Sequence, residues 1–269
     1  MAIDVDGTLA NGRGDVSGPV EQAVRDARAA GVEVVLVSGR PQVAALPVFT
    51  QLGLALPLIS SGGAYVSDPS SGRIIAEVQP DRDAVRGFVE LAREAGTTLI
   101  FQTPTELFGE GRLDIIEELR ATNRTWIERV DDGLAACPRP IKISACGPRE
   151  TLASLESAVV RRGLSVSLVY SGPEYLEMTA AGVSKGNALR RLVDDLGIPR
   201  DRVLVIGDAP NDVSMFQEAG LAVAMGNAAA DVQGAADIVA PTLEEDGVAW
   251  TLRRFVFGSE VNSVENPSG

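Results

Sequence analysis

Hydrophobic residues along the chain gather in short runs that alternate with amphipathic stretches. Near the N-terminus the pattern predicts strands at 2–5, 32–37 and 56–59, a helix at 19–30 and a second helix from Pro41. The run at 32–37 is almost unbroken, as expected for a parallel strand covered on both faces. This alternation of strands and helices indicates a doubly wound α/β arrangement.

The rhythm changes in the middle of the chain and then resumes. The pattern there predicts helices at 81–95 and 149–162 and strands at 98–102, 141–145 and 164–170. A polar stretch separates the strand at 98–102 from the strand at 141–145. The first pattern returns with helices at 185–196, 212–219 and 228–235 and strands at 203–206, 221–224 and 238–240. We therefore predict an α/β protein with a doubly wound parallel-sheet core, residues 1–78 and 180–257. An inserted α+β domain covers 79–179, and 258–269 form a disordered tail.

The charge of the chain limits its partners. The formal net charge is −13, which repels nucleic-acid phosphates and anionic lipids, so neither is an expected partner. No apolar run approaches the roughly 18 residues that a membrane span requires, and the N-terminal residues lack the order of a signal peptide. Cys137 and Cys146 have no metal-binding or redox spacing. The expected location is therefore the cytoplasm.

The absence of one residue type excludes several kinds of chemistry. The chain has no histidine, which rules out Ser-His-Asp and Cys-His catalysis, histidine-ligated zinc and imidazole general bases. Any catalysis must use carboxylates, hydroxyls, lysine and a hard cation.

Polar residues stand where the predicted core strands end. Four segments share this position: Asp4 to Thr8, Ser38 to Arg40, Lys185, and Gly207 to Asp212. Ligands of a doubly wound sheet bind at the carboxyl ends of its strands, so these residues are expected to meet. Crowded carboxylates need a neutralising cation, and an oxygen-only set beside a lysine suits Mg²⁺ together with a phosphate.

These segments resemble the motifs of the haloacid dehalogenase superfamily, in its Cof-type sugar-phosphatase branch, which includes sucrose-phosphate and archaeal-type phosphoglycolate phosphatases. Asp4-Val5-Asp6-Gly7-Thr8-Leu9 is similar to the first motif, and Val37-Ser38-Gly39-Arg40 to the second. Gly182-Val183-Ser184-Lys185-Gly186 is similar to the third motif, and Gly207-Asp208 through Asn211-Asp212 to the fourth. The resemblance implies a Rossmann-like core and identifies the inserted domain as a cap.

The resemblance also implies a role for each motif residue. Asp4 would be the nucleophile that forms an aspartyl-phosphate, and Asp6 the general acid and base. Asp4, the backbone carbonyl of Asp6, Asp208 and Asp212 would hold Mg²⁺. Ser38, Gly39, Lys185 and Asn211 would bind the phosphoryl group. Two acids two residues apart on a strand would face the same way, and a turn that Gly7 permits would separate them.

The function that this resemblance implies is Mg²⁺-dependent hydrolysis of a small phosphorylated metabolite, of the sugar-phosphate or phosphoglycolate type. A phosphomannomutase-like phosphotransferase and a non-catalytic module that binds a phosphorylated metabolite are the alternatives. Three departures from the family stand out. Only three residues precede Asp4, Gly62 replaces the usual Asn, and Ala209-Pro210 replaces a loop that commonly contains glycine. The role of Arg40 stays open between a phosphate contact and a partner for a surface acid.

Overall fold

The centre of the fold is a parallel sheet built from both ends of the chain. The computed structural model describes residues 1–11, 13–123 and 125–258. The sheet has the strand order β14-β13-β12-β1-β2. Its strands are β1 (Ala2–Ile3), β2 (Val35–Leu36), β12 (Leu204–Gly207), β13 (Leu221–Ala224) and β14 (Ile238–Val239). The first strand is short, as expected from the few residues before Asp4, and it lies between strands from opposite ends of the chain.

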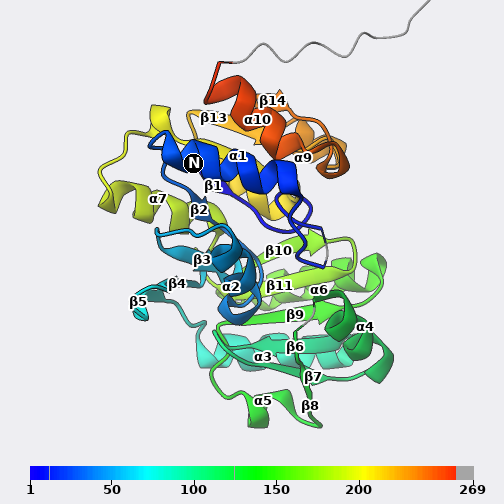
Figure 1. Cartoon of the computed structure of the whole chain (residues 1–269). Coiled ribbons are helices and arrows are strands. Elements are labelled where there is room, and N and C mark those ends of the chain that lie inside the picture. Colours follow the sequence, from blue (N-terminus) through cyan, green and yellow to red (C-terminus); the bar gives the residue numbers. More distant parts are fainter. Residues whose placement is uncertain (12, 124, 259–269) are drawn as a thin grey trace, which may run out of the picture.

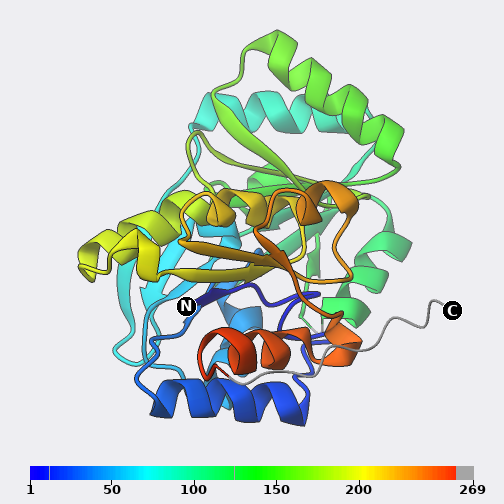
Figure 2. The same cartoon turned by 90° about the horizontal axis from the view of Figure 1, so that it is seen from above.

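Helices cover both faces of this sheet, because alternate strand residues point to opposite sides. Ile3, Leu36 and Ile206 pack against one group of helices, and Ala2, Val35 and Val205 against the other. The first group comprises α1 (Gly18–Ala29), α2 (Gln42–Gln51) and α10 (Gly247–Phe255). The second comprises α7 (Lys185–Asp195), α8 (Val213–Phe216) and α9 (Ala230–Gln233). Figure 2 shows these layers from above.

The inserted domain, here called the cap, is built on a second sheet. Its strand order is β10-β11-β9-β6-β7-β8, and all pairs are antiparallel except β7 with β8. The strands are β6 (Thr98–Gln102), β7 (Leu107–Glu110), β8 (Glu128–Arg129), β9 (Lys142–Cys146), β10 (Val166–Gly172) and β11 (Tyr175–Ala180). The antiparallel α+β insertion predicted from the sequence is thus present. Its boundaries at 79 and 179 stay a proposal.

The two faces of the cap sheet are covered differently. Leu99, Phe101, Ile143 and Met178 pack under α3 (Arg82–Glu94) and α6 (Arg149–Arg162). The opposite face turns toward the core and carries α4 (Leu113–Asn123) at one side (Figure 1). A four-residue helix, α5 (Gly133–Ala136), packs at the edge of the cap.

A small three-stranded sheet joins the core to the cap. It contains β3 (Leu58–Ser60), β4 (Tyr65–Asp68) and β5 (Arg73–Glu77), and β3 continues the core sheet through a bridge between Val37 and Ile59. Every helix of the described residues is too short or too polar to cross a bilayer. The predicted tail, apart from its first residue, lies outside the described residues.

Candidate active site

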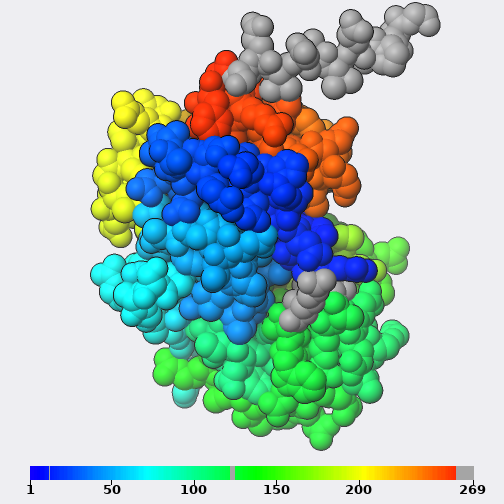
Figure 3. Space-filling view, viewed as in Figure 1, coloured from blue at the N-terminus to red at the C-terminus, as the bar shows by residue number. Residues whose placement is uncertain are grey.

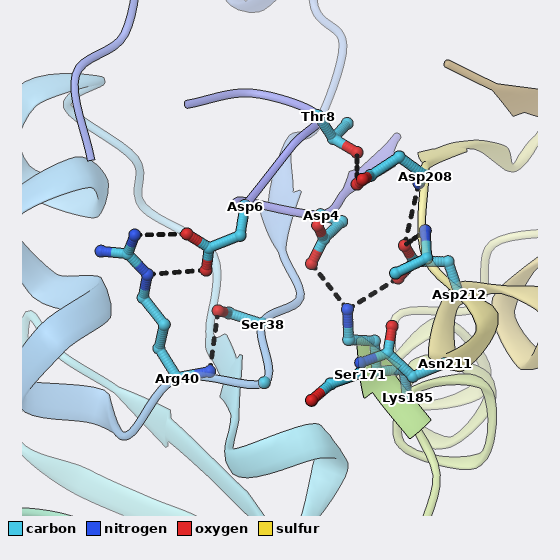
Figure 4. Close-up of polar contacts among 12 residues, drawn as sticks. Asp4, Asp6, Thr8, Ser38, Arg40, Ser171, Lys185, Asp208, Asn211 and Asp212 are labelled. Carbon is cyan, nitrogen blue, oxygen red and sulfur yellow. Dashed lines mark hydrogen bonds and ion pairs between the residues drawn. The ribbon is translucent and has the colours of Figure 1, made fainter. Parts of the chain in front are cut away.

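The polar segments predicted at the strand ends come together at one edge of the core sheet. Lys185, at the start of α7, lies between two carboxylates: its Nζ is 2.6 Å from Asp4 Oδ1 and 2.7 Å from Asp212 Oδ1. All three side chains are buried. Figure 4 shows this bridge at the centre of the site. Asp4 and Lys185, 181 positions apart in the sequence, thus form one buried ion pair.

The loop after β12 is held in shape by its own carboxylates. Asp212 Oδ2 accepts hydrogen bonds from the backbone N–H groups of Asp208, at 3.0 Å, and Ala209, at 2.9 Å. Thr8 Oγ1 donates to Asp208 Oδ1 at 2.7 Å, which ties this loop to the first motif. Asp212 is therefore oriented by three donors, and Asp208 is aimed at the space beside Asp4.

Three carboxylates form a compact acidic cluster. One oxygen from each of Asp4, Asp208 and Asp212 lies within 4.8 Å of the others. Burial, reinforced by the charge of Asp212, raises the pKa of Asp4 well above its usual value, and burial raises the pKa of Asp208 to about 6. Burial alone would lower the pKa of Lys185, but Asp212 and Asp4 outweigh it and the pKa is raised.

One lysine offsets only part of the charge of three carboxylates, so the cluster favours a bound cation. The oxygen-only donor set, with no histidine or cysteine, suits a hard ion such as Mg²⁺. The residues present therefore fit the metal that the sequence predicts.

Asp6 lies apart from this cluster, as the turn at Gly7 predicts. Gly7 has a φ of 78°, and a Cβ at this position would lie 2.2 Å from Asp208 Oδ2. Only glycine combines this backbone conformation with the close approach of Asp208. The Asp6 carboxylate instead accepts hydrogen bonds from Nε and Nη2 of Arg40, with 2.7 Å between Nε and Oδ2. Arg40, whose role the sequence leaves open, is thus the partner of Asp6.

The predicted phosphate-binding residues surround Asp4. Ser38 is fully buried, and its Oγ accepts a hydrogen bond from the backbone N–H of Arg40 at 3.0 Å, which leaves the hydroxyl hydrogen for another acceptor. Asn211 Oδ1 is a buried side-chain oxygen with no hydrogen-bond partner among the described residues. A Cβ on Gly39 would lie 3.8 Å from the Asn211 amide nitrogen. Ser38, Gly39 and Asn211 therefore lie around a common space beside Asp4.

Two residues of the cap complete the site, and the sequence analysis did not identify them. Lys142 Nζ lies 2.7 Å from Glu177 Oε1 and 2.7 Å from the carbonyl oxygen of Gly39, so it connects the cap to the core. Ser171 Oγ donates to the same oxygen of Glu177 at 3.0 Å. A signal was present in the sequence, because Lys142 and Lys185 are the only lysines of the chain. A lone lysine that opens an apolar strand is a candidate for function.

A cavity of about 340 Å³ lies between the acidic cluster and the cap sheet. Its walls include Asp4, Asp6, Arg40 and Lys185 from the core, and Lys142 and Glu177 from the cap. In the space-filling view the cap (green) packs against the blue part of the core (Figure 3). A ligand beside Asp4 would therefore contact both domains.

Comparison with known proteins identifies relatives over almost the whole chain. The family model of haloacid dehalogenase-like hydrolases matches residues 1–252. Phosphatase YwpJ of Bacillus subtilis is 30% identical over 95% of this chain and 99% of its own length. A phosphoglycolate phosphatase of Halorubrum lacusprofundi is 32% identical over 94% of this chain and 95% of its own.

Solved structures agree with this result. A haloacid dehalogenase-like hydrolase from Bacteroides thetaiotaomicron has a TM-score of 0.82 at 30% identity, over 94% of this chain and 97% of its own. The subclass IIB sugar phosphatase BT4131 shares the fold, with a TM-score of 0.85 at 22% identity over 95% and 98% of the two chains. The chain therefore belongs to the haloacid dehalogenase-like hydrolases, and it is a phosphatase of their Cof-type branch.

Proposed function

We propose that this phosphatase is Mg²⁺-dependent and hydrolyses a small phosphorylated metabolite through an aspartyl-phosphate on Asp4. The observation that carries the proposal is the bridge of Lys185 between Asp4 and Asp212. This bridge holds Asp4 Oδ1 2.6 Å from Lys185 Nζ, and Asp4 still lines the cavity. This supports the proposal, because a carboxylate held in this way beside a hydroxyl with a free hydrogen can attack a phosphoryl group.

In the first step an oxygen of Asp4 attacks phosphorus, and the bond from phosphorus to the ester oxygen breaks. Asp6 gives a proton to the leaving oxygen. In the second step Asp6 takes a proton from a water molecule, the water oxygen attacks phosphorus, and the bond from phosphorus to Asp4 breaks. Inorganic phosphate leaves, and both carboxylates return to their starting states.

Asp4, Asp208, Asp212 and the backbone carbonyl of Asp6 would hold Mg²⁺. When bound, the ion reduces the repulsion between the Asp4 carboxylate and the phosphate and stabilises charge on the phosphoryl oxygens. Lys185 supplies a fixed positive charge beside Asp4. The hydroxyl of Ser38, the amide of Asn211 and the backbone of Gly39 would orient the phosphoryl oxygens.

The substrate class follows from the relatives and from charge. Relatives include the phosphoglycolate phosphatase above and a 5-amino-6-(5-phospho-D-ribitylamino)uracil phosphatase of Bacillus subtilis, both named for phosphate esters of small molecules. The net charge of −13 supports a small ligand bound by local cations over a nucleic acid or a membrane. The phosphotransferase and binding-module alternatives are not proposed, because the named relatives are phosphatases. A cytoplasmic location stays a prediction.

Phosphate release from a panel of phosphorylated metabolites tests the proposal. We expect Asp4→Asn to lower turnover at least about a thousandfold while circular dichroism stays that of the wild type. Asp194→Asn, an exposed position on α7, is the matched control and should keep full activity. EDTA should abolish release and Mg²⁺ restore it. Wild-type turnover by Asp4→Asn, or in EDTA, would overturn the proposal.

A further inference from the structure

The cavity has two unlike ends. Asp4, Lys185 and Arg40 make one end charged, as a phosphate requires. The remaining wall is the face of the cap sheet that α3 and α6 leave uncovered. A ligand that holds its phosphate at Asp4 must extend along this face.

The strand register places the side chains of this face in order. Gln102 pairs with Lys142, and Glu177 lies on the neighbouring strand opposite Ser144. These four side chains form a polar strip. Ile100 lies on the other side of Ser144, and Cys146 pairs with Tyr175 farther from Lys142 along the same strands. The wall therefore changes from polar to apolar within one sheet.

The polar strip is joined to the core. Lys142 bonds to the Gly39 carbonyl and to Glu177, each at 2.7 Å, and Gln102 Nε2 donates to Ser61 Oγ at 2.6 Å. These contacts fix the strip near the phosphate end. Its amide and carboxylate groups are suited to the hydroxyl groups of a linker.

The apolar end is a separate cluster at the base of α4. Each member of this cluster is at least partly buried among the others, and each also lines the cavity. They are Ile100, Leu107, Leu119, Ile127, Cys146 and Tyr175. The main cap core lies on the opposite face of the sheet. Since apolar surface exposed to water is costly, an apolar ligand group that covers this cluster gains binding free energy.

A two-carbon phosphate ester would fill the charged end and leave this apolar corner uncovered. The cavity volume of about 340 Å³ lies at the lower limit of sites that bury a small organic ligand. On the basis of the proposed function, we propose that the substrate is a phosphate monoester with a polar linker and an apolar or planar group of ring size at its far end. Ile100, Leu107, Leu119 and Tyr175 then select for that group.

Matched substrates test this inference. Phosphate release is measured with Mg²⁺ for ribose 5-phosphate and uridine 5′-monophosphate, and for n-propyl phosphate and 3-phenylpropyl phosphate. Within each pair the phosphate and linker are alike and the second member adds a ring. We expect the ring to raise kcat/KM by about tenfold or more, because each apolar group placed in a fitted pocket contributes at least that factor.

Variants then locate the effect. Leu107→Asn and Leu119→Asn should each lower the ratio of kcat/KM between the two members of a pair by about threefold or more. Leu113→Asn is the matched control, because Leu113 lies on the same helix as Leu119 but is 50% exposed and does not line the cavity. Its ratio should equal that of the wild type. Leu119 is only partly buried, so Leu119→Asn should fold and can test the inference even if Leu107→Asn does not fold.

The outcomes separate this inference from the proposed function. Equal kcat/KM values within both pairs would overturn the substrate class while leaving the phosphatase reaction intact. A ring preference that survives both cavity variants would overturn the assignment to this corner. Release of phosphate from none of the four esters, nor from a wider panel, would count against the proposed reaction itself.

Discussion

Arg40 holds both carboxylate oxygens of Asp6, with 2.7 Å between Arg40 Nε and Asp6 Oδ2. The Arg40 side chain is 8% exposed and that of Asp6 is 42% exposed, and both residues line the cavity. Both carboxylate oxygens of Asp6 are therefore occupied as hydrogen-bond acceptors. In the proposed mechanism Asp6 gives a proton to the leaving group, so it would have to turn away from Arg40, and we expect the freed guanidinium then to bind the substrate phosphate.

This exchange predicts a binding defect in Arg40→Gln. We expect KM to rise by about tenfold or more, because a charged hydrogen bond to the phosphate is lost, while the fold is retained. Steady-state phosphate release measures both kcat and KM. Arg161→Gln, an exposed arginine on α6, is the control and should leave both constants unchanged. An unaltered KM in Arg40→Gln would show that Arg40 does not contact the substrate.

The close approach of Asp208 to Gly7 can be tested by substitution. Its φ is 78° and a Cβ would meet Asp208 Oδ2 at 2.2 Å, whereas Gly31 has a φ of 89° and nothing within 4 Å of the Cβ position. Gly31→Ala should cost about 1–2 kcal/mol of unfolding free energy from backbone strain alone. Gly7→Ala should cost more and should also weaken the apparent Mg²⁺ affinity by about tenfold or more, since Asp208 is displaced.

Urea unfolding and the Mg²⁺ dependence of phosphate release provide the two measurements for this pair. The comparison is sharp because the two glycines share the left-handed conformation and differ in the space around them. Equal Mg²⁺ affinities in Gly7→Ala and Gly31→Ala would contradict the role given to Asp208.

The sequence predicted the charged half of the site better than the cap half. Asp4 and Asp212 meet because both follow strands of one parallel sheet, whose carboxyl ends share one edge, and that topology was visible in the apolar runs. The pairing of Arg40 with Asp6 was not predicted from the sequence, because it depends on the direction that a long side chain takes across a loop. The contact of Lys142 with the Gly39 carbonyl depends on how the cap docks on the core, which no local pattern encodes.

Part of the fold was missed for similar reasons. The stretch at 103–140 contains α4 and β7, whose apolar residues form only a small cluster, so the hydrophobic periodicity is weak. Gly109 lies within β7, where a Cβ would lie 2.9 Å from Ile116 Cδ1 of α4, and it breaks the apolar pattern of this strand. Helix α10 was also missed by the sequence analysis, although its buried Val248, Ala249 and Leu252 follow helical spacing.

Lys185 is predicted to stabilise the metal-free protein strongly. Replacing it in Lys185→Met leaves the buried Asp4 and Asp212 side by side without a cation. We expect a loss of about 3–5 kcal/mol in unfolding free energy in EDTA, and a smaller loss in Mg²⁺ because the ion replaces part of the missing charge. Urea denaturation in the two buffers measures this difference. Arg190→Met, on the exposed side of the same helix, should change stability little in either buffer.

The raised pKa of Asp208 predicts how Mg²⁺ stabilisation depends on pH. A carboxyl with a pKa of about 6 in the folded protein and 3.8 in its model state binds more protons when folded. The metal-free protein therefore loses stability as the pH rises from about 4 through about 6, by on the order of 3 kcal/mol from this group. Asp4, whose pKa is also raised, acts in the same direction.

Mg²⁺ at the proposed site would need the deprotonated carboxylates, so it would compete with protons below pH 6 and reduce the repulsion between the carboxylates above pH 6. The rise in melting temperature caused by Mg²⁺ should therefore be small at pH 5 and several degrees larger at pH 7.5. Thermal unfolding with and without the ion across this range measures it. Asp208→Asn should flatten the dependence because the titrating carboxyl is gone. A larger stabilisation by Mg²⁺ at pH 5 than at pH 7.5 would mean that the ion binds away from Asp4 and Asp208.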